Sequence, residues 1–264
     1  MENFEFVSPT HFVFGRDAEQ KVGAKLAERG ATRVLLHYGG SSAVKSGLID
    51  RVKASLAEAG IVCVELGGVR PNPEITLVRE GVALCKREGV DWILAVGGGS
   101  VIDSAKAIAN GACIDEDVWE LFETKRPNPH VLPIAVVLTI PAAGSEASKN
   151  TVISNDELQR KSGYGNDFQR PKLAFMNPEL TFTLPEYQTA AGITDMFAHL
   201  LERFFDDMGA VPVTDNLNLS LMRTARAGRS RKLRRARQHH VGGHAVPPGP
   251  CGRRSPRGLG HPRA

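Results

Sequence analysis

Short apolar runs alternate with amphipathic stretches through the first 185 residues of the chain. The apolar runs have strand length and are bounded by glycine or polar residues. They predict strands at Arg33–Tyr38, Ile61–Leu66, Asp91–Val96 and Ile134–Thr139. Because these runs are apolar throughout and are separated by helical patterns, we expect an α/β fold in which helices cover both faces of a parallel sheet.

Apolar residues at helical spacing predict the helices between these strands, and the pattern changes after Leu184-Pro185. There a long amphipathic stretch is followed by the start of another helix, so residues 186–222 are expected to begin an all-helical second domain. The expected helices are Ser46–Ala59, Thr76–Glu88, the segment from the end of the GGGS loop to Ala109, Glu186–Phe205 and a segment that starts at Asn216–Leu221.

Residues 223–264 have a different composition from the rest of the chain. They contain 12 Lys or Arg and no Asp or Glu, whereas residues 1–222 contain 21 basic and 29 acidic side chains. The segment has no Phe, Tyr, Trp or Ile, so it cannot bury enough apolar surface to offset the entropy of ordering, and we expect a disordered basic tail. Such a tail could bind nucleic acid through phosphates, but without aromatic residues for base stacking we expect no specific nucleic acid partner.

Composition also limits the cellular setting. No stretch reaches the roughly 18 to 20 apolar residues that span a bilayer, so we expect no membrane partner. The opening MENFEFVSPTHF carries acids and lacks the basic region of a signal peptide, which predicts a cytoplasmic protein. The four cysteines show no CxxC spacing, which favours incidental thiols over a metal site or disulfides.

The segment DWILAVGGGSVIDSAKAIA holds the strongest candidate site. A strand leads into Gly97, Gly98, Gly99 and Ser100, and a helix follows directly. Glycines let a ligand approach the backbone, and the free N–H groups of a helix N-terminus attract anions, so a pyrophosphate is the expected ligand. Asp103 lies one turn later, where it could bind a ribose hydroxyl or cap the turn. The spacing is neither GxGxxG nor Walker A, and a purely structural turn is the alternative.

Two further segments carry candidate chemistry. The loop LTIPAAGSEAS follows a strand end and offers Thr139 and Ser145, although it could be an ordinary turn before a hairpin. Asp195 and His199 are spaced i, i+4 on an expected helix and therefore share one face. A carboxylate and an imidazole suit a divalent transition metal, whereas the alternative is a surface hydrogen bond.

Together these segments resemble the iron-containing (group III) alcohol dehydrogenase family, in particular its butanol dehydrogenase and aldehyde reductase-like branch. The pieces FVSPTHFVFG, RPNPEI and MNPELTFTLP add to the resemblance. It implies a Rossmann-like N-terminal domain over residues 1–185, hydride transfer between NADP or NAD and a small primary alcohol or aldehyde, a divalent metal (iron or zinc) in the helical domain, and a homo-oligomer, as a dimer. A glycerol-dehydrogenase-like enzyme of the same superfamily is the neighbouring alternative.

The resemblance also assigns roles to residues. It implies that Asp195 and His199 are the first two metal ligands, through which they would be catalytic. The family's two later histidine ligands have no counterpart in a family-like context, so we expect a truncated chain with little activity. The expected cofactor-binding residues are Gly39, Gly40, Ser41, Ser42, Gly97, Gly98, Gly99, Ser100, Asp103, Thr139, Ser145 and Lys161. Residues 39–42 contain no acid to repel a 2′-phosphate and Lys45 is nearby, which favours NADP(H).

The basic tail is consistent with out-of-frame translation. Permitted codons for Arg237–Ala245, read one base later, encode Ala-Asn-Ile-Met-Trp-Ala-Ala-Thr, which resembles a helix of this family. The same shift at Leu259–Arg263 permits Trp-Ala-Thr-His, whose histidine resembles the third metal ligand. We therefore expect a frameshift in residues 223–264, with a genuine basic tail as the alternative.

Overall fold

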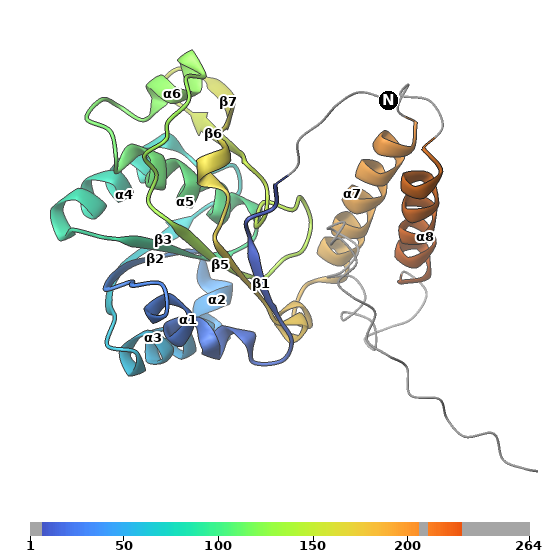
Figure 1. Ribbon diagram of the computed structural model, residues 1–264, viewed down its shortest axis with the longest axis horizontal. Coiled ribbons are helices and arrows are strands. Elements are labelled where there is room, and N and C mark those ends of the chain that lie inside the picture. Colours follow the sequence, from blue (N-terminus) through green and yellow to red (C-terminus); the bar gives the residue numbers. More distant parts are fainter. Residues whose placement is uncertain (1–6, 206–210, 229–264) are drawn as a thin grey trace, which may run out of the picture.

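The computed structural model describes residues 7–205 and 211–228 (Figure 1). The elements of its N-terminal part are β1 (His11–Phe14), η1 (Ala18–Lys21), α1 (Val22–Ala27), β2 (Arg33–Gly39), α2 (Ser41–Lys45), α3 (Leu48–Glu58), β3 (Val62–Val69), α4 (Ile75–Glu88), β4 (Trp92–Gly97) and α5 (Gly99–Gly111). They are followed by α6 (Trp119–Thr124), β5 (Ile134–Leu138), β6 (Asn150–Asn155), β7 (Arg160–Gly165), η2 (Asp167–Gln169), β8 (Leu173–Met176), η3 (Pro178–Thr181), α7 (Glu186–Phe204) and α8 (Pro212–Gly228).

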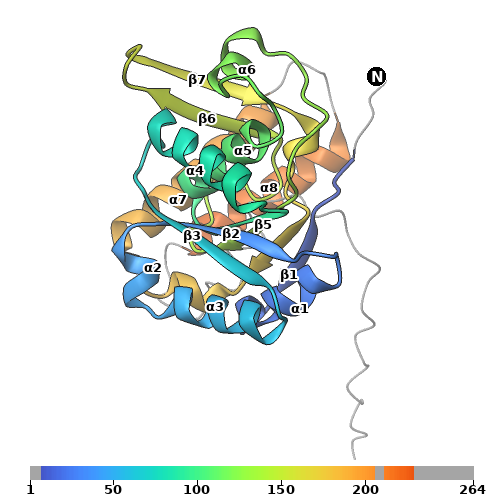
Figure 2. The ribbon, with the colours of Figure 1, turned by 90° about the vertical axis from the view of Figure 1, so that its left-hand side faces the viewer.

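A six-stranded parallel sheet forms the centre of the molecule, with the strand order β1-β8-β5-β4-β2-β3. Strands β6 and β7 pair separately as an antiparallel hairpin. Every residue of β4 and β5 is buried, as expected for strands covered on both faces. Figure 2 shows α4 and α5 on one side of the sheet and α1 and α3 on the other, so the predicted α/β architecture is confirmed.

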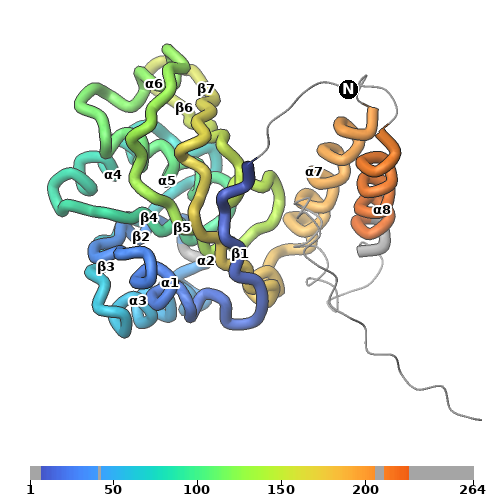
Figure 3. Tube along the Cα trace, in the orientation of Figure 1, coloured from blue at the N-terminus to red at the C-terminus, as the bar shows by residue number. Residues whose placement is uncertain are grey.

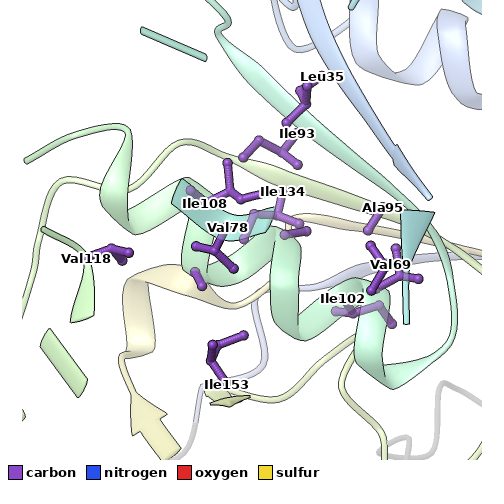
Figure 4. Packing of buried hydrophobic residues seen from close by; sticks show 14 of the residues in the cluster. Leu35, Val69, Val78, Ile93, Ala95, Ile102, Ile108, Val118, Ile134 and Ile153 are labelled. Atoms are coloured by element: carbon purple, nitrogen blue, oxygen red, sulfur yellow. The ribbon is translucent and has the colours of Figure 1, made fainter. Parts of the chain in front are cut away.

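Alternate side chains of each strand enter two separate hydrophobic cores, one on each face of the sheet. On β2, Leu35 belongs to the core beneath α4 and α5, whereas Leu36 belongs to the core beneath α1 and α3. Figure 4 shows the first of these cores, where Ile102 and Ile108 of α5 pack with strand residues such as Ile134. This packing fixes the position of α5 over the strands that precede and follow it.

Helices α7 and α8 lie side by side next to the α/β layers (Figures 1 and 3). Their buried residues include Met196 and Leu200 on α7 and Met222 on α8. Within the described part of the chain, no helix combines the length and the apolar character that a membrane crossing needs. The start of α7 coincides with the change of pattern at Pro185.

Several elements differ from those expected from the sequence. Strands β1 and β8 were not expected, because four residues are too few to show a period. The strands β6 and β7 were expected only in the alternative reading of LTIPAAGSEAS as a turn before a hairpin, and the structure does show a hairpin after this loop. The helix expected at Ser46–Ala59 starts instead at Leu48, since Gly47 has a positive φ of 69° that separates α2 from α3. Helix α8 extends to Gly228, beyond the expected boundary at residue 222, and Ala225 is buried. The remainder of the expected basic tail, residues 229–264, lies outside the described residues.

Candidate functional site

Two expected cofactor loops, residues 97–100 (the first loop) and residues 139–148 (the second loop), meet at the carboxyl edge of the sheet. Tyr38 of β2 pairs with Val96 of β4, and Gly97 pairs with Leu138 of β5, so the ends of these three strands lie next to one another. The chain leaves β2 toward β3 on one side and later returns as β4 on the other side. The edge between β2 and β4 is therefore a topological switch point, where open parallel sheets bind ligands.

The three glycines of the first loop differ in what surrounds them. A Cβ on Gly97 would lie 2.4 Å from Val101 Cγ2, and one on Gly98 would lie 3.3 Å from Ile140 Cβ, so internal packing accounts for both. A Cβ on Gly99 would meet nothing within 4 Å, and its φ is not positive. Gly99 therefore leaves open space at the first residue of α5.

The N-terminus of α5 is available to a ligand. Its N-cap is Gly98, no side chain caps it, and Gly99 and Ser100 form its first turn. The first N–H groups of a helix have no partner inside the helix, and the helix dipole favours an anion beside them. A thirteen-residue helix that begins beside open space thus offers the features of a phosphate site.

The residues expected at the adenosine end follow β2 directly. Gly39 is the last residue of β2, and Gly40 is exposed, with nothing within 4 Å of an added Cβ. The backbone of Ser41 and Ser42 opens the short helix α2. These four residues therefore share the switch-point edge with the first loop.

Glycine usage supports a ligand at this edge. Among the glycines of residues 7–205, Gly40 and Gly99 are the two with neither a positive φ nor an atom within 4 Å of an added Cβ. A positive φ accounts for glycine at positions such as Gly60 (φ 71°), and close packing accounts for it at positions such as Gly97. Both unexplained glycines lie at the switch point, where an approaching ligand would need the space.

Asp103 is directed to the second loop rather than to open space. Its Oδ1 accepts a hydrogen bond from Ser145 Oγ (2.6 Å), and its Oδ2 accepts one from the backbone N–H of Val152 (3.0 Å). In the structure the Asp103 carboxylate therefore makes tertiary contacts rather than capping its own turn. The ribose contact drawn from the sequence stays a prediction, since a carboxylate can accept further hydrogen bonds. The Ser145 hydroxyl, which gives its only proton to Asp103, can act toward a ligand only as an acceptor.

Lys106, which the sequence analysis did not single out, completes this network. Its side chain is fully buried, and its Nζ donates to Ser145 Oγ (2.8 Å) and to the carbonyl oxygen of Asn150 (2.8 Å). Burial lowers the pKa of Lys106 to about 8, against the opposing effect of the Asp103 and Glu146 carboxylates. Burial also raises the pKa of Asp103, and the positive charge of Lys106 counters this effect. A lysine in a helix usually extends into solvent, so the sequence pattern contained no signal for this role.

The remaining expected cofactor residues lie around this network. The backbone N–H of Thr139 donates to the carbonyl oxygen of Gly97 (3.1 Å), which joins the starts of the two loops. Lys161 is an exposed residue of β7, and its Nζ donates to Asn72 Oδ1 (2.8 Å). Its charge lowers the pKa of Asp103, although less than that of Lys106, so Lys161 is electrostatically coupled to this edge.

Asp195 and His199 lie on the same face of α7, as predicted from their spacing. Asp195 Oδ1 is 3.8 Å from His199 Nε2, and Glu202 Oε2 is 3.7 Å from His199 Nδ1, with all three side chains partly or largely exposed. One turn before Asp195, Gly192 packs against the second loop, since an added Cβ would lie 3.1 Å from the Pro141 carbonyl oxygen. Helix α7 therefore contacts the loop that follows β5.

The described residues do not complete a metal site. No group of three or more His, Cys, Asp or Glu within residues 7–205 and 211–228 is arranged to hold a metal ion. Asp195 and His199 are suitable donor types, but protein sites for zinc and related metals use three or four protein ligands. Any metal held by this pair needs donors from outside the described residues.

The structure is a Rossmann-like α/β domain followed by helices. The profile of the iron-containing alcohol dehydrogenase family matches residues 9–178. The chain belongs to this family. A "Probable NADH-dependent butanol dehydrogenase 1" of Bacillus subtilis is 42% identical over 224 residues, which cover 85% of this chain and 58% of the relative.

Other relatives are likewise named as nicotinamide-dependent dehydrogenases or reductases. The "NADPH-dependent aldehyde reductase YqhD" of Escherichia coli is 35% identical over 207 residues, 77% of this chain and 52% of the relative. The crystal structure of NADH-dependent butanol dehydrogenase A from Thermotoga maritima superposes with a TM-score of 0.86 at 39% identity, over 92% of this chain and 61% of that chain. The chain thus spans between about half and three fifths of the length of these relatives. The predicted family and its branch are confirmed.

Proposed function

We propose that this chain carries the dinucleotide-binding part of an oxidoreductase that transfers a hydride between NAD(P)(H) and a small primary alcohol or aldehyde. The observation that carries the proposal is Gly99, which leaves space without an internal reason at the uncapped N-terminus of α5. The names of the relatives supply the reaction class: butanol dehydrogenases and an aldehyde reductase.

In this proposal each part of the switch-point edge has a separate task. The N–H groups of Gly99 and Ser100 bind the pyrophosphate, and Gly39 and Gly40 leave room for the adenosine ribose. The nicotinamide ring, when bound, supplies the hydride chemistry. Thr139 and the second loop border the same edge and exclude water from one side of the cofactor.

Asp195 and His199 are proposed as two of the ligands of a divalent metal. Their chemistry and spacing suit this role, and the contact between Gly192 and Pro141 brings α7 to the cofactor edge. Because the described residues provide only these two donors in such an arrangement, we assign no step of the reaction to the metal.

The test is the substitution Gly99→Ala. An added methyl group at this position has room in the protein, so we expect unchanged thermal stability, whereas the affinity for NADPH or NADH should fall about tenfold or more, which corresponds to about 1.4 kcal/mol. Binding is measured by nicotinamide fluorescence titration. Gly163→Ala is the matched control, because a Cβ there makes only ordinary contacts at 3.8 Å on β7 and should leave the affinity unchanged. Equal affinities of the unmodified protein and the Gly99→Ala variant would contradict the proposed site.

A further inference from the structure

The second loop is attached at both of its ends to elements of the first loop. At its start, Thr139 N–H donates to Gly97, the last residue of β4. At its end, Lys106 of α5 donates to Ser145 and to the carbonyl oxygen of Asn150, the first residue of β6. The helix that begins at the glycine loop therefore also holds the loop on the other side of the site.

Burying the charged side chain of Lys106 costs folding free energy, so a purely structural role does not explain it. A charged amine loses its hydration in the interior, and an apolar side chain of similar size usually stabilises a core as well or better. Lys106 is nevertheless fully buried, with its ammonium group hydrogen-bonded to Ser145 and Asn150. What the ammonium group provides that an apolar residue cannot is a defined position for the loop residue Ser145.

We propose that Lys106 is a positioning residue that holds the loop Thr139–Ser148 against α5 and thereby sets the affinity of the site for the dinucleotide. The inference rests on the proposed function, since it assumes a dinucleotide at this edge. Lys106 itself is too deeply buried to contact the cofactor. It acts through Ser145, whose hydroxyl accepts from Lys106 and donates to Asp103, so that all three side chains have fixed orientations.

The charge of Lys106 contributes to this arrangement and makes it sensitive to pH. The charged groups that act on its ammonium are Asp103 on α5, Glu146 in the loop and Arg170 after η2, of which the two carboxylates favour the protonated form. Because the pKa of Lys106 is lowered to about 8, the ammonium is present below that pH and is lost as the pH rises through it. The dinucleotide affinity should fall over the same interval.

The test compares Lys106→Met with Lys125→Met. Lys125 is also a lysine that anchors segments, through Phe122 and Ser162, but it lies between α6 and β7. We expect Lys106→Met to raise the Kd for NADPH about tenfold or more in fluorescence titrations at pH 7, and Lys125→Met to leave it unchanged within about twofold. In the unmodified protein and in Lys125→Met the Kd should rise severalfold between about pH 7 and 9, whereas in Lys106→Met it should stay constant over that range.

A second variant covers the case in which Lys106→Met fails to fold, which urea unfolding would reveal. Ser145→Ala should raise the Kd by a smaller factor, and the double variant should bind no more weakly than Lys106→Met, because both residues act in one network. If the unmodified protein binds NADPH but Lys106→Met or Ser145→Ala binds equally well with the same pH profile, the positioning role is refuted and the proposed function stands. If the unmodified protein binds neither NADPH nor NADH, the proposed function itself fails.

Discussion

Gly40 is the residue at which we expect the choice between NAD(H) and NADP(H) to be made. It is exposed directly after β2, it has no positive φ, and an added Cβ would meet nothing within 4 Å. Neither Gly39 nor the three residues after it is acidic, and Lys45 ends the short helix α2. An acid in this position typically binds the adenosine ribose of NAD and repels the 2′-phosphate of NADP. Among the relatives described above, the two butanol dehydrogenases are named NADH-dependent and the aldehyde reductase is named NADPH-dependent, so both preferences occur in the family.

We therefore predict tighter binding of NADPH than of NADH, and a reversal on Gly40→Asp. The new carboxylate has room to reach the ribose, so the affinity for NADPH should fall about tenfold while that for NADH is maintained or improved. Gly40→Ala is the matched control, because it adds bulk without charge and should keep the original preference. Titration of the three proteins with both cofactors checks the prediction; a preference for NADH in the unmodified protein would refute it.

The tertiary partners of the polar residues Asp103 and Lys106 of α5 could not be predicted from the sequence. Asp103 was identified because it follows the glycine loop at helical spacing, but its partners Ser145 and Val152 are more than forty residues away in sequence and could not be inferred. Lys106 was not identified, because a lysine in an amphipathic helix normally lies in solvent. Only the packing of the second loop against α5 makes it a buried residue.

Helix α5 is the element on which the site depends. Its N-terminus borders the switch point, Ile102 and Ile108 fill the core beneath it, and Asp103 and Lys106 hold the second loop. Near its start, Ser104 contacts His37 of β2, whose other ring nitrogen contacts the Leu66 carbonyl oxygen of β3. The helix is therefore fixed by apolar packing and by polar contacts on several sides.

His37 should make the stability of this unit depend on pH. It is fully buried and neutral: Nδ1–H donates to Leu66 O (2.8 Å), and Nε2 accepts from the Ser104 hydroxyl (2.9 Å). Burial lowers its pKa from 6.5 to about 4. Below pH 6.5 the unfolded chain therefore binds a proton that the folded state does not bind until about pH 4. The contribution of His37 is complete above 6.5 and is lost as the pH falls toward 4, by about 3 kcal/mol in total.

Urea unfolding at several pH values between 7.5 and about 4.5 measures this effect. The protein should lose stability on acidification more steeply than a His37→Gln variant, because glutamine does not titrate. The exposed His130→Gln change is the control and should keep the slope of the unmodified protein. Identical slopes for His37→Gln and the unmodified protein would show that the buried histidine is not the titrating group.

Sequence patterns identified the elements that build the site but missed those at the margins of the fold. The strands β2, β4 and β5 and the helices α4 and α5 agree with the expected ranges to within about two residues, since each carries a strong apolar pattern. β1 and β8 have four residues each, too few to show a period, and the hairpin β6–β7 is polar on its outer face. The break at Gly47 was not visible because residues on both sides have helical patterns.

At the scale of the whole molecule, the distribution of charge divides the chain. Residues 1–222 have an excess of acidic side chains, whereas none of the 42 residues after them is acidic. The family profile matches residues 9–178, which lie wholly before the change of composition. A functional basic arm and an out-of-frame segment both account for such a division, and they differ in what the DNA encodes.

We predict that the DNA downstream of the Met222 codon encodes a further helical segment of the family in another reading frame. The permitted codons CGC CAA CAT CAT GTG GGC GGC CAC GCN for Arg237–Ala245 become GCC AAC ATC ATG TGG GCG GCC ACG when the first base is dropped, which encodes Ala-Asn-Ile-Met-Trp-Ala-Ala-Thr. Free third bases cannot create Met-Trp from an arbitrary protein string, and the same shift permits Trp-Ala-Thr-His at Leu259–Arg263.

Resequencing this region decides between the two explanations, with the codons of Thr76–Glu88, where sequence and structure agree on a helix, as the internal control. The expected outcome is a single shifted frame that continues past the codon of Ala264 with apolar residues at helical spacing and with further histidines. Those histidines would add donors to Asp195 and His199, which alone offer too few for a stable metal site. If every alternative frame is interrupted by stop codons or lacks helical periodicity, the basic segment is genuine and the frameshift hypothesis is wrong.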